Sequence, residues 1–492
     1  MIAADVRRLG PHPRRGEVEV DPRLIWWGLV VATVVAAGLR LPFLGHQSLW
    51  LDEIFTRNLI GQPSLTAVWN HVQATESTPP LYYVLAWLLG GRSAASMRAL
   101  PACALIAAVP VTFLALRRLV GEWPALATAA IVAVSPELVQ YSLDARAYGL
   151  FVLTGLLSLW AFAGLLERES PTRYLGWVAA SVACVWTHYF GFFLVAAEAI
   201  VLLSVRPSAW RRTAGWSVVI AACLAPLAPL LSHQNGERAA FIPGIPLMTR
   251  LTQTVRQFGM GANVPRTWLE AAGLALALAA FAVGAVAAVR SGTRSRSLVA
   301  LVAFGFAVPL AVAVLGIEDR FYDRNLLFLL PLLAALAAPA LLRLGAAPLA
   351  VYLALAVLTS VWVSSNWRYE QADWHAAAER TKALAPAAAV ITVGSTSQFS
   401  VAVAGTYVGR PATATPVFAH QGWIVVEPYR APHHRALGPA PVPYAIIASL
   451  PGFRIERSLI VHGFRLILLT ATKPTPIVPA KLPGAAVFPG PP

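Results

Sequence analysis

Long apolar runs separated by short polar segments fill the sequence up to residue 363. A membrane-spanning helix needs about 20 mostly apolar residues, and eleven runs approach this length. They are residues 24–41, 95–116, 123–142, 147–166, 174–188, 189–205, 214–232, 267–289, 298–316, 325–342 and 347–363. The pattern predicts eleven membrane-spanning helices, of which the short ones at 174–188 and 189–205 need shelter from neighbouring helices.

Arginine residues are concentrated in every second loop between these runs. The residues are Arg117, Arg118, Arg168, Arg173, Arg206, Arg211, Arg212, Arg290, Arg294, Arg296 and Arg343. Because cytoplasmic loops retain basic residues, we expect these loops and the basic tail, residues 1–23, to be cytoplasmic, and the C-terminus to lie outside. No small-residue cleavage site follows the first run, so it is expected to be a retained helix.

The first outer loop, residues 45–94, is too long for a simple turn. Its moderately apolar piece, Pro79 to Trp87, is too short to span a bilayer, and its aromatic residues suit the headgroup region. A span here would also place Arg117 and Arg118 outside, against the charge pattern. We therefore expect interfacial helices in this loop.

Beyond residue 363 the apolar runs become short and are separated by Gly and Pro. An amphipathic helix begins near Asp373, and later runs have the length of strands. The predicted fold is an all-α polytopic membrane bundle, residues 24–363, with a small extracytoplasmic α/β domain, residues 364–472. The Pro-rich end, residues 473–492, is predicted to be disordered.

The composition agrees with a multi-pass protein of the plasma (inner) membrane. Of the 492 residues, 57% are hydrophobic and 12% charged, against about 25% charged in soluble domains. A net charge of +15 would suggest a nucleic-acid partner in a soluble protein. Here the arginines lie between membrane runs, so we expect none. The three cysteines lie in apolar runs without metal-ligand spacing, so neither disulfides nor a zinc site is predicted.

Adjacent carboxylates follow the first apolar run, in Trp50-Leu51-Asp52-Glu53. A carboxylate near a bilayer is costly. It could accept a proton from a hydroxyl group or bind a divalent cation. The alternative for this motif is a solvated surface loop.

Three further polar motifs fall on the predicted outer side. Residues 76–83 read as a Pro-initiated helix start, and residues 141–148 carry Asp144 and Arg146, which could simply form a structural ion pair. Residues 319–325 carry Arg320 and Arg324. Arginine suits bidentate phosphate recognition, and positive charge on the outer side departs from the topology pattern.

These motifs, in this order and with Thr187-His188-Tyr189-Phe190-Gly191, resemble the membrane glycosyltransferases of the GT-C class. The resemblance is greatest to the bacterial group related to protein O-mannosyltransferases and lipid A aminoarabinose transferases, and it covers most of residues 24–380. It implies transfer of a sugar from a polyprenyl-phosphate carrier to an acceptor hydroxyl, with inversion.

The resemblance also implies roles for single residues. Asp52 matches the catalytic acidic residue of the first loop and Glu53 its neighbour, while Arg146, Arg324 and Arg320 are candidates for the donor phosphate. The candidates for a substrate groove are Trp50, Tyr82, Tyr83, Asp144, Tyr148, His188, Tyr189 and Tyr322. Relatives commonly have Glu where this chain has Asp144, so a divalent metal (Mg or Mn) held by Asp52 and Asp144 stays open as a cofactor.

The chemistry is consistent with these roles. A sugar joined to phosphate already has a good leaving group, so the enzyme needs a base, which contributes roughly 10²–10⁴-fold, and positive charge for the departing phosphate. Asp52 is the expected base. Mannose is the first expected sugar and a pentose such as arabinose the second. The expected partners are this donor, a lipid, glycan or protein acceptor, and membrane lipids.

Two other functions compete with transfer. One is a transporter or flippase of a lipid-linked sugar, which would place ionisable residues at the membrane midplane. The other is a non-catalytic envelope assembly protein that uses its outer C-terminal domain. Polar groups gathered at one membrane face favour transfer.

Overall fold

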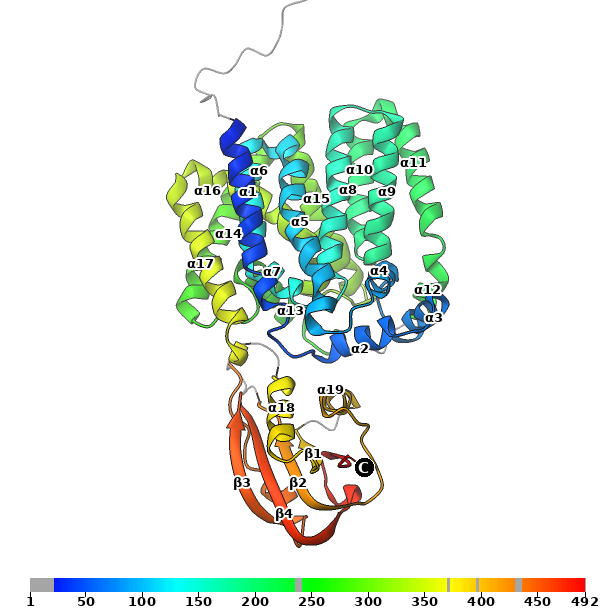
Figure 1. Cartoon of the computed structure of the whole chain (residues 1–492). Helices are drawn as coiled ribbons and strands as arrows, with labels where there is room; N and C mark the ends of the chain where they lie inside the picture. Colours follow the sequence, from blue (N-terminus) through cyan, green and yellow to red (C-terminus); the bar gives the residue numbers. More distant parts are fainter. Residues whose placement is uncertain (1–21, 235–240, 370–371, 395–397, 430–435, 492) are drawn as a thin grey trace, which may run out of the picture.

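The computed structural model describes residues 22–234, 241–369, 372–394, 398–429 and 436–491. Its helices stand side by side in a bundle, and a five-stranded sheet lies beyond one end of this bundle (Figure 1). We call this the sheet end. The architecture agrees with the predicted helical bundle followed by a smaller α/β part.

Each of the eleven predicted apolar runs is helical. The helices are α1 (Pro22–Gly38), α5 (Ala94–Val120), α6 (Glu122–Val134) with α7 (Pro136–Ser142), α8 (Tyr148–Glu167), α9 (Pro171–Thr187), α10 (Gly191–Val205), α11 (Trp210–Leu224) with α12 (Leu227–His233), α14 (Thr267–Arg290), α15 (Thr293–Val314), α16 (Leu329–Arg343) and α17 (Ala346–Ser364). The break between α6 and α7 follows from Ser135 and Pro136. The Ser135 side chain caps α7 by accepting from the Leu138 N–H, and Pro136 occupies the first helical position.

The predicted number of eleven spans is not confirmed. Among the described residues, six helices are long and apolar enough to cross a membrane. A seventh is added if α10 and the segment Pro207–Leu224, which meet at a bend of 109°, count as one span. Helices such as α6 and α16 are apolar but shorter.

The basic loops lie at the end of the bundle opposite the sheet (Figure 1). Arg118 contacts Glu167 at 3.2 Å and Arg206 contacts Glu169 at 3.3 Å, which ties the α8–α9 turn to the ends of α5 and α10. Arginines that are far apart in sequence therefore share one end of the molecule.

The first loop contains three short helices, α2 (Leu51–Ile60), α3 (Leu65–Thr75) and α4 (Leu81–Leu89), which pack across the sheet end (Figure 1). None is long enough to span a membrane. Helix α13 (Leu247–Met260) lies in a segment predicted as a loop. It was not predicted because its sequence mixes polar and apolar residues and contains no long apolar run.

The C-terminal sheet has the strand order β3-β4-β2-β1-β5. The strands are β1 (Ala389–Val393), β2 (Val417–Val426), β3 (Arg454–Val461), β4 (Phe464–Ile477) and β5 (Ala485–Phe488), and only β1 and β2 pair in parallel. Helices α18 (Trp374–Leu384), α19 (Gln398–Val408) and α20 (Tyr444–Ala448) accompany it. Trp374 of α18 packs edge-on against Phe464 at 4.9 Å.

The prediction of a disordered tail over residues 473–492 is wrong for the part that the structure describes. Strand β4 continues to Ile477, and β5 pairs antiparallel with β1. Val487 and Phe488 are fully buried. Burial of these apolar side chains and the strand pairing outweigh the high proline content that suggested disorder.

Two close helix crossings depend on glycine. A Cβ atom at Gly149 of α8 would lie 2.6 Å from the Pro101 carbonyl oxygen of α5, and one at Gly284 of α14 would overlap the Leu336 carbonyl oxygen of α16. Small residues at such crossings let two helix backbones approach closely. These contacts fix the bundle that supports the sheet end.

Candidate active site

Asp52 and Glu53 both lie in the first turn of α2, but their side chains have different partners. The Glu53 side chain is fully buried and accepts hydrogen bonds from Arg98, at 2.6 Å from Nε and 2.5 Å from Nη2. It also accepts from the backbone N–H groups of Ala145 (2.9 Å) and Trp50 (3.3 Å). A buried ion pair needs such full hydrogen bonding to offset desolvation. Glu53 therefore anchors the helix, and the geometry gives no support to a catalytic role for it.

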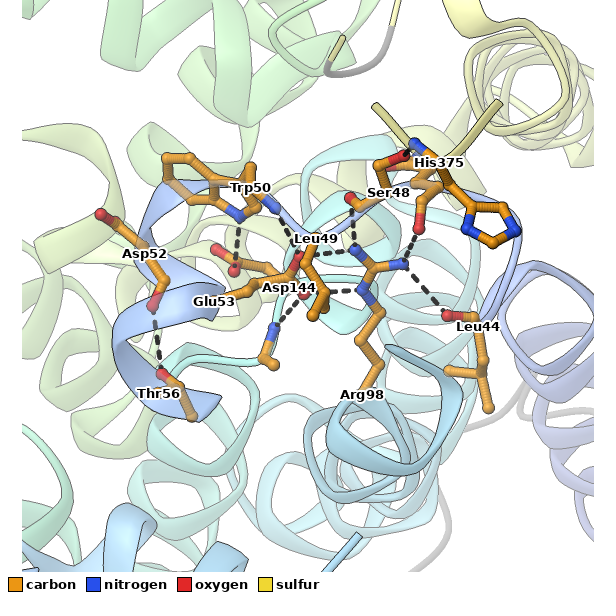
Figure 2. Close-up of polar contacts among 12 residues, drawn as sticks. Leu44, Ser48, Leu49, Trp50, Asp52, Glu53, Thr56, Arg98, Asp144 and His375 are labelled. Carbon is orange, nitrogen blue, oxygen red and sulfur yellow. Dashed lines mark hydrogen bonds and ion pairs between the residues drawn. The ribbon is translucent and has the colours of Figure 1, made fainter. Parts of the chain in front are cut away.

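The Asp52 side chain points away from this ion pair (Figure 2). Its Oδ2 lies 3.5 Å from Nη1 of Arg324, which is 272 residues later in the chain. The side chains of Asp52 and Arg324 are 22% and 20% exposed. The structure therefore brings together the predicted base and one predicted phosphate ligand, and leaves both open to a ligand.

Three aromatic rings surround the guanidinium group of Arg324. Its Cζ atom lies 5.4 Å from the ring centre of Phe241, 5.6 Å from that of Tyr322 and 5.8 Å from that of Tyr148. Cation–π contacts of this kind hold an arginine in place without using its N–H groups. Tyr148 and Tyr322 thus lie beside Arg324, together with Phe241, and their place in a substrate groove stays a prediction.

Arg146 also reaches the site but is buried beneath it. Its Nη2 lies 2.8 Å from Oε2 of Glu76, and its Nη1 donates to the Asp52 carbonyl and the Thr56 hydroxyl, both at 3.4 Å. The hydroxyl of Tyr83 donates to the same Glu76 oxygen at 2.7 Å. Arg146 therefore supports the backbone of α2, and direct contact with a donor phosphate is not evident from these bonds.

Asp144 holds the ring of Trp50. Its buried carboxyl group accepts from Trp50 Nε1 at 3.1 Å (Figure 2). Burial, with the nearby charges of Glu53 and Asp52, raises the pKa of Asp144 to about 8. The side chain is therefore largely protonated at neutral pH.

The candidate metal ligands do not fit a metal ion. Asp52 faces the positive charge of Arg324, and Asp144 is bonded to Trp50. In the part of the chain that the structure describes, no three His, Cys, Asp or Glu side chains are grouped so that they could hold a metal ion.

Several residues predicted for the substrate groove are buried instead. Tyr82 and Tyr83 are fully buried in the packing of α4. His188 is 3% exposed, stacks on Phe151 with ring centres 4.5 Å apart, and accepts from the Phe190 N–H. These side chains pack the protein, so the prediction that they line a groove is wrong.

Two more predicted residues contact other parts of the protein. Tyr189 donates to Gln234 at 2.7 Å, and Gln234 in turn donates to carbonyl groups of the first loop, so this link holds the loop. Arg320 pairs with the exposed Glu318 at 2.6 Å. Neither residue contacts Asp52 in the described structure.

Parts of the sequence and the overall fold are similar to those of known membrane proteins. The family described as dolichyl-phosphate-mannose-protein mannosyltransferase matches residues 77–233. The crystal structure of ArnT from Cupriavidus metallidurans bound to undecaprenyl phosphate superposes with a TM-score of 0.54 at 13% identity, covering 91% of this chain and 98% of that one. The apo structure of the same ArnT gives the same values. Residues 77–233 are thus similar to a family of membrane glycosyltransferases, and the whole chain has the fold of the ArnT structures.

The GT-C resemblance of the sequence motifs is thus confirmed, and the ArnT likeness establishes the fold. An oligosaccharyltransferase from Archaeoglobus fulgidus, in complex with Zn and sulfate, matches at 14% identity with a TM-score of 0.45. That match covers 73% of this chain, which spans 55% of the length of the archaeal protein. No curated protein sequence matches.

Two residues that position the site, Arg98 and Glu76, were not among the predicted site residues. Arg98 lies in the run predicted to span the membrane at residues 95–116, and an arginine inside an apolar run is itself a signal of a buried partner. Glu76 stands before two prolines and was read as part of a helix start. The ion pairs Arg98–Glu53 and Arg146–Glu76 join residues 45 and 70 positions apart, so no local sequence pattern predicts them.

A second ion pair supports the segment that carries Arg324. Arg250 of α13 forms a bidentate contact with Asp319, at 2.6 and 2.7 Å, and also donates to the Phe321 carbonyl at 2.8 Å. These bonds from Arg250 lower the pKa of Asp319, although burial opposes the shift. The 319–325 segment is therefore anchored to α13.

An apolar cavity of about 550 Å³ lies between α13, α14, α15 and α16. Leu329 and Leu330, at the start of α16 and a few residues after Arg324 in the chain, line it. Thr254, one turn after Arg250, lines it from α13. The lining consists almost entirely of Leu, Ala, Val and Phe side chains, which suits a hydrocarbon chain.

Proposed function

We propose that this chain transfers a glycosyl group from a polyprenyl-phosphate-linked sugar to an acceptor hydroxyl group at the extracytoplasmic face of the membrane. The observation that carries the proposal is the approach of Asp52 and Arg324 to 3.5 Å at the sheet end, with both side chains partly exposed. A base beside a phosphate-binding cation is the pair of groups that this reaction needs.

The proposed reaction uses these two groups in turn. The donor phosphate binds the N–H groups of Arg324 and frees the Asp52 carboxylate from its contact. Asp52 then accepts the proton of the acceptor hydroxyl while the acceptor oxygen bonds to the sugar C1. The bond from C1 to the phosphate oxygen breaks, and the phosphate leaves with the electron pair, stabilised by Arg324. Attack opposite the leaving phosphate gives inversion.

The apolar cavity beside α16 supports a lipid carrier. An isoprenoid chain could lie among its Leu, Ala, Val and Phe side chains while the phosphate reaches Arg324. We take mannose as the first sugar to test and a pentose as the second, with a lipid, glycan or protein as the acceptor. Basic loops at the opposite end of the bundle favour an outer location for the site.

The first test is transfer from a panel of labelled polyprenyl-phosphate sugars in membranes that contain the protein. We expect the label of one sugar to leave the carrier, and Asp52→Asn to lower this rate by about 10²-fold or more, because the base is lost. Glu122→Gln, which changes an exposed carboxylate at the opposite end, should leave the rate unchanged.

A second pair of variants tests the phosphate ligand. Arg324→Lys keeps the charge but loses the forked N–H geometry, so the KM for the donor should rise. Arg320→Lys is the matched control, because Arg320 pairs with Glu318 away from Asp52. Unchanged transfer by Asp52→Asn, or a label that crosses the membrane while still on its carrier, would contradict the proposal.

A further inference from the structure

The segment that leads into α2 is held from two sides. From the bundle, Arg98 donates to the carbonyl groups of Leu44 (3.1 Å), Gln47 (2.9 Å) and Ser48 (3.0 Å) (Figure 2). The same guanidinium group binds Glu53. On this side, one buried arginine therefore fixes both the segment and the first turn of the helix.

From the C-terminal domain, two side chains reach the same segment. The Leu49 N–H donates to the Tyr407 hydroxyl of α19 at 2.5 Å. The Ser48 hydroxyl donates to Asp373 at 2.8 Å. It also accepts from the backbone N–H of His375 at 2.9 Å (Figure 2). Residues 48 and 49 are thus bonded to α18 and α19.

Asp373 is itself held firmly. It caps α18 by accepting from the Ala376 N–H at 3.1 Å, and it contacts His462 at 2.6 Å. His462 stacks on Trp367 and lies in the left-handed region, with φ 44°, at the turn between β3 and β4. Burial would raise the pKa of Asp373, but these bonds lower it overall, so the carboxylate is a permanent acceptor for Ser48.

Apolar packing joins the same elements. Leu49 and Ile54 belong to one buried cluster with Val403 and Ala404 of α19 and Trp374 of α18. Burial of shared apolar surface holds the domain against the first loop. The polar contacts then set where residues 48 and 49 lie.

We infer that the C-terminal domain is part of the catalytic unit, in which Tyr407 and Asp373 are positioning residues that set the place of Asp52. Asp52 follows Leu49 by three residues, at the first turn of α2. A misplacement of a catalytic group by about 1 Å can lower the rate by about 10²-fold. Loss of the hydrogen bonds at residues 48 and 49 could therefore lower the rate by shifting Asp52. This inference rests on the proposed function.

The test is a steady-state comparison of Tyr407→Phe with the wild-type full chain, normalised to folded protein by size-exclusion chromatography. Removal of one hydroxyl group should lower kcat by about 10- to 100-fold and leave the donor KM unchanged, because Arg324 is held separately by Arg250, Asp319 and the aromatic rings. Tyr429→Phe, at an exposed tyrosine of the same domain, should have wild-type kcat.

A double-mutant cycle tests the second contact. Ser48→Ala and Asp373→Ala break one bond from opposite sides. Asp373→Asn is the matched variant, because its amide oxygen can keep both the cap of α18 and the acceptor for Ser48. We therefore expect the double variant to lose no more kcat than Asp373→Ala alone. Glu379→Gln, on the exposed face of α18, is the control.

Three results would overturn the inference: wild-type kcat in Tyr407→Phe, additive losses in the cycle, or a loss explained wholly by less folded protein. A wild-type protein that transfers no sugar would contradict the proposed function instead. An active wild type with an unaffected Tyr407→Phe contradicts only the role of the domain.

Discussion

Neighbouring side chains of the same chemical type have opposite roles in this protein. Asp52 and Glu53 are adjacent carboxylates, yet Asp52 faces Arg324 with 22% exposure whereas Glu53 is fully buried on Arg98. Successive side chains on a helix point about 100° apart, so one residue can face a ligand while the next enters the core. The sequence named both residues as catalytic, with Asp52 as the base, and could not show that only Glu53 is buried.

Asp144 should make the folded protein less stable as the pH rises. Its pKa is about 8 in the folded protein and about 4 in the unfolded chain. Between these values the folded state keeps a proton that the unfolded state has released, so the free energy of unfolding falls as pH rises, by up to about 1.4 kcal/mol per pH unit. Asp144→Asn removes this contribution and keeps an acceptor for Trp50.

The measurement is the thermal unfolding midpoint of purified protein at pH 5 and pH 8. We expect Asp144→Asn to gain stability relative to wild type on going from pH 5 to pH 8. Asp319→Asn is the control, because the pKa of Asp319 is lowered and the group stays ionised over this range. A constant difference between Asp144→Asn and wild type would show that Asp144 is ionised throughout.

At the scale of the element, α2 is a short helix held by an ion pair rather than by its own length. It has ten residues, and isolated helices of this length are marginal in water. The sequence predicted interfacial helices in the first loop from the segment Pro79 to Trp87, but it predicted neither α2 nor its anchor. Arg98 and Glu53 are 45 residues apart, and no periodic pattern links them.

We expect Glu53→Gln to destabilise the protein by about 3–5 kcal/mol, because it leaves the charge of Arg98 buried without a counter-ion. Glu167→Gln breaks the partly exposed pair with Arg118 and should cost less than about 1 kcal/mol. Denaturant unfolding in detergent, followed by tryptophan fluorescence, compares the two variants. Equal losses would mean that the Arg98–Glu53 pair is not the anchor of α2.

At the scale of the molecule, the chain has two chemically different ends. Ion pairs among basic loops tie one end together, and the Asp52–Arg324 site and the sheet occupy the other. The concentration of arginines in every second loop predicted this division, because basic loops tend to stay on the cytoplasmic side of a membrane. The tail was mispredicted because strand pairing between β5 and β1 joins residues about 95 positions apart and cannot be read from composition.

The two ends should face different compartments. In a background with Cys103 and Cys223 replaced by Ser, Cys184 remains buried. A membrane-impermeant thiol reagent applied to intact cells should then label Glu379→Cys, on α18, and not Arg294→Cys, in the first turn of α15. Labelling only after the cells are opened would place the sheet end in the cytoplasm and rule out an outer site.

The rings of Tyr148, Phe241 and Tyr322 restrict how a ligand can meet Arg324. The Arg324 Cζ lies over the face of each ring, so the sides that the rings occupy are closed to a ligand. An anion must reach the N–H groups from a side that the rings leave open, and Asp52 Oδ2 lies on such a side, 3.5 Å from Nη1. Whatever binds Arg324 is therefore brought next to the Asp52 carboxylate.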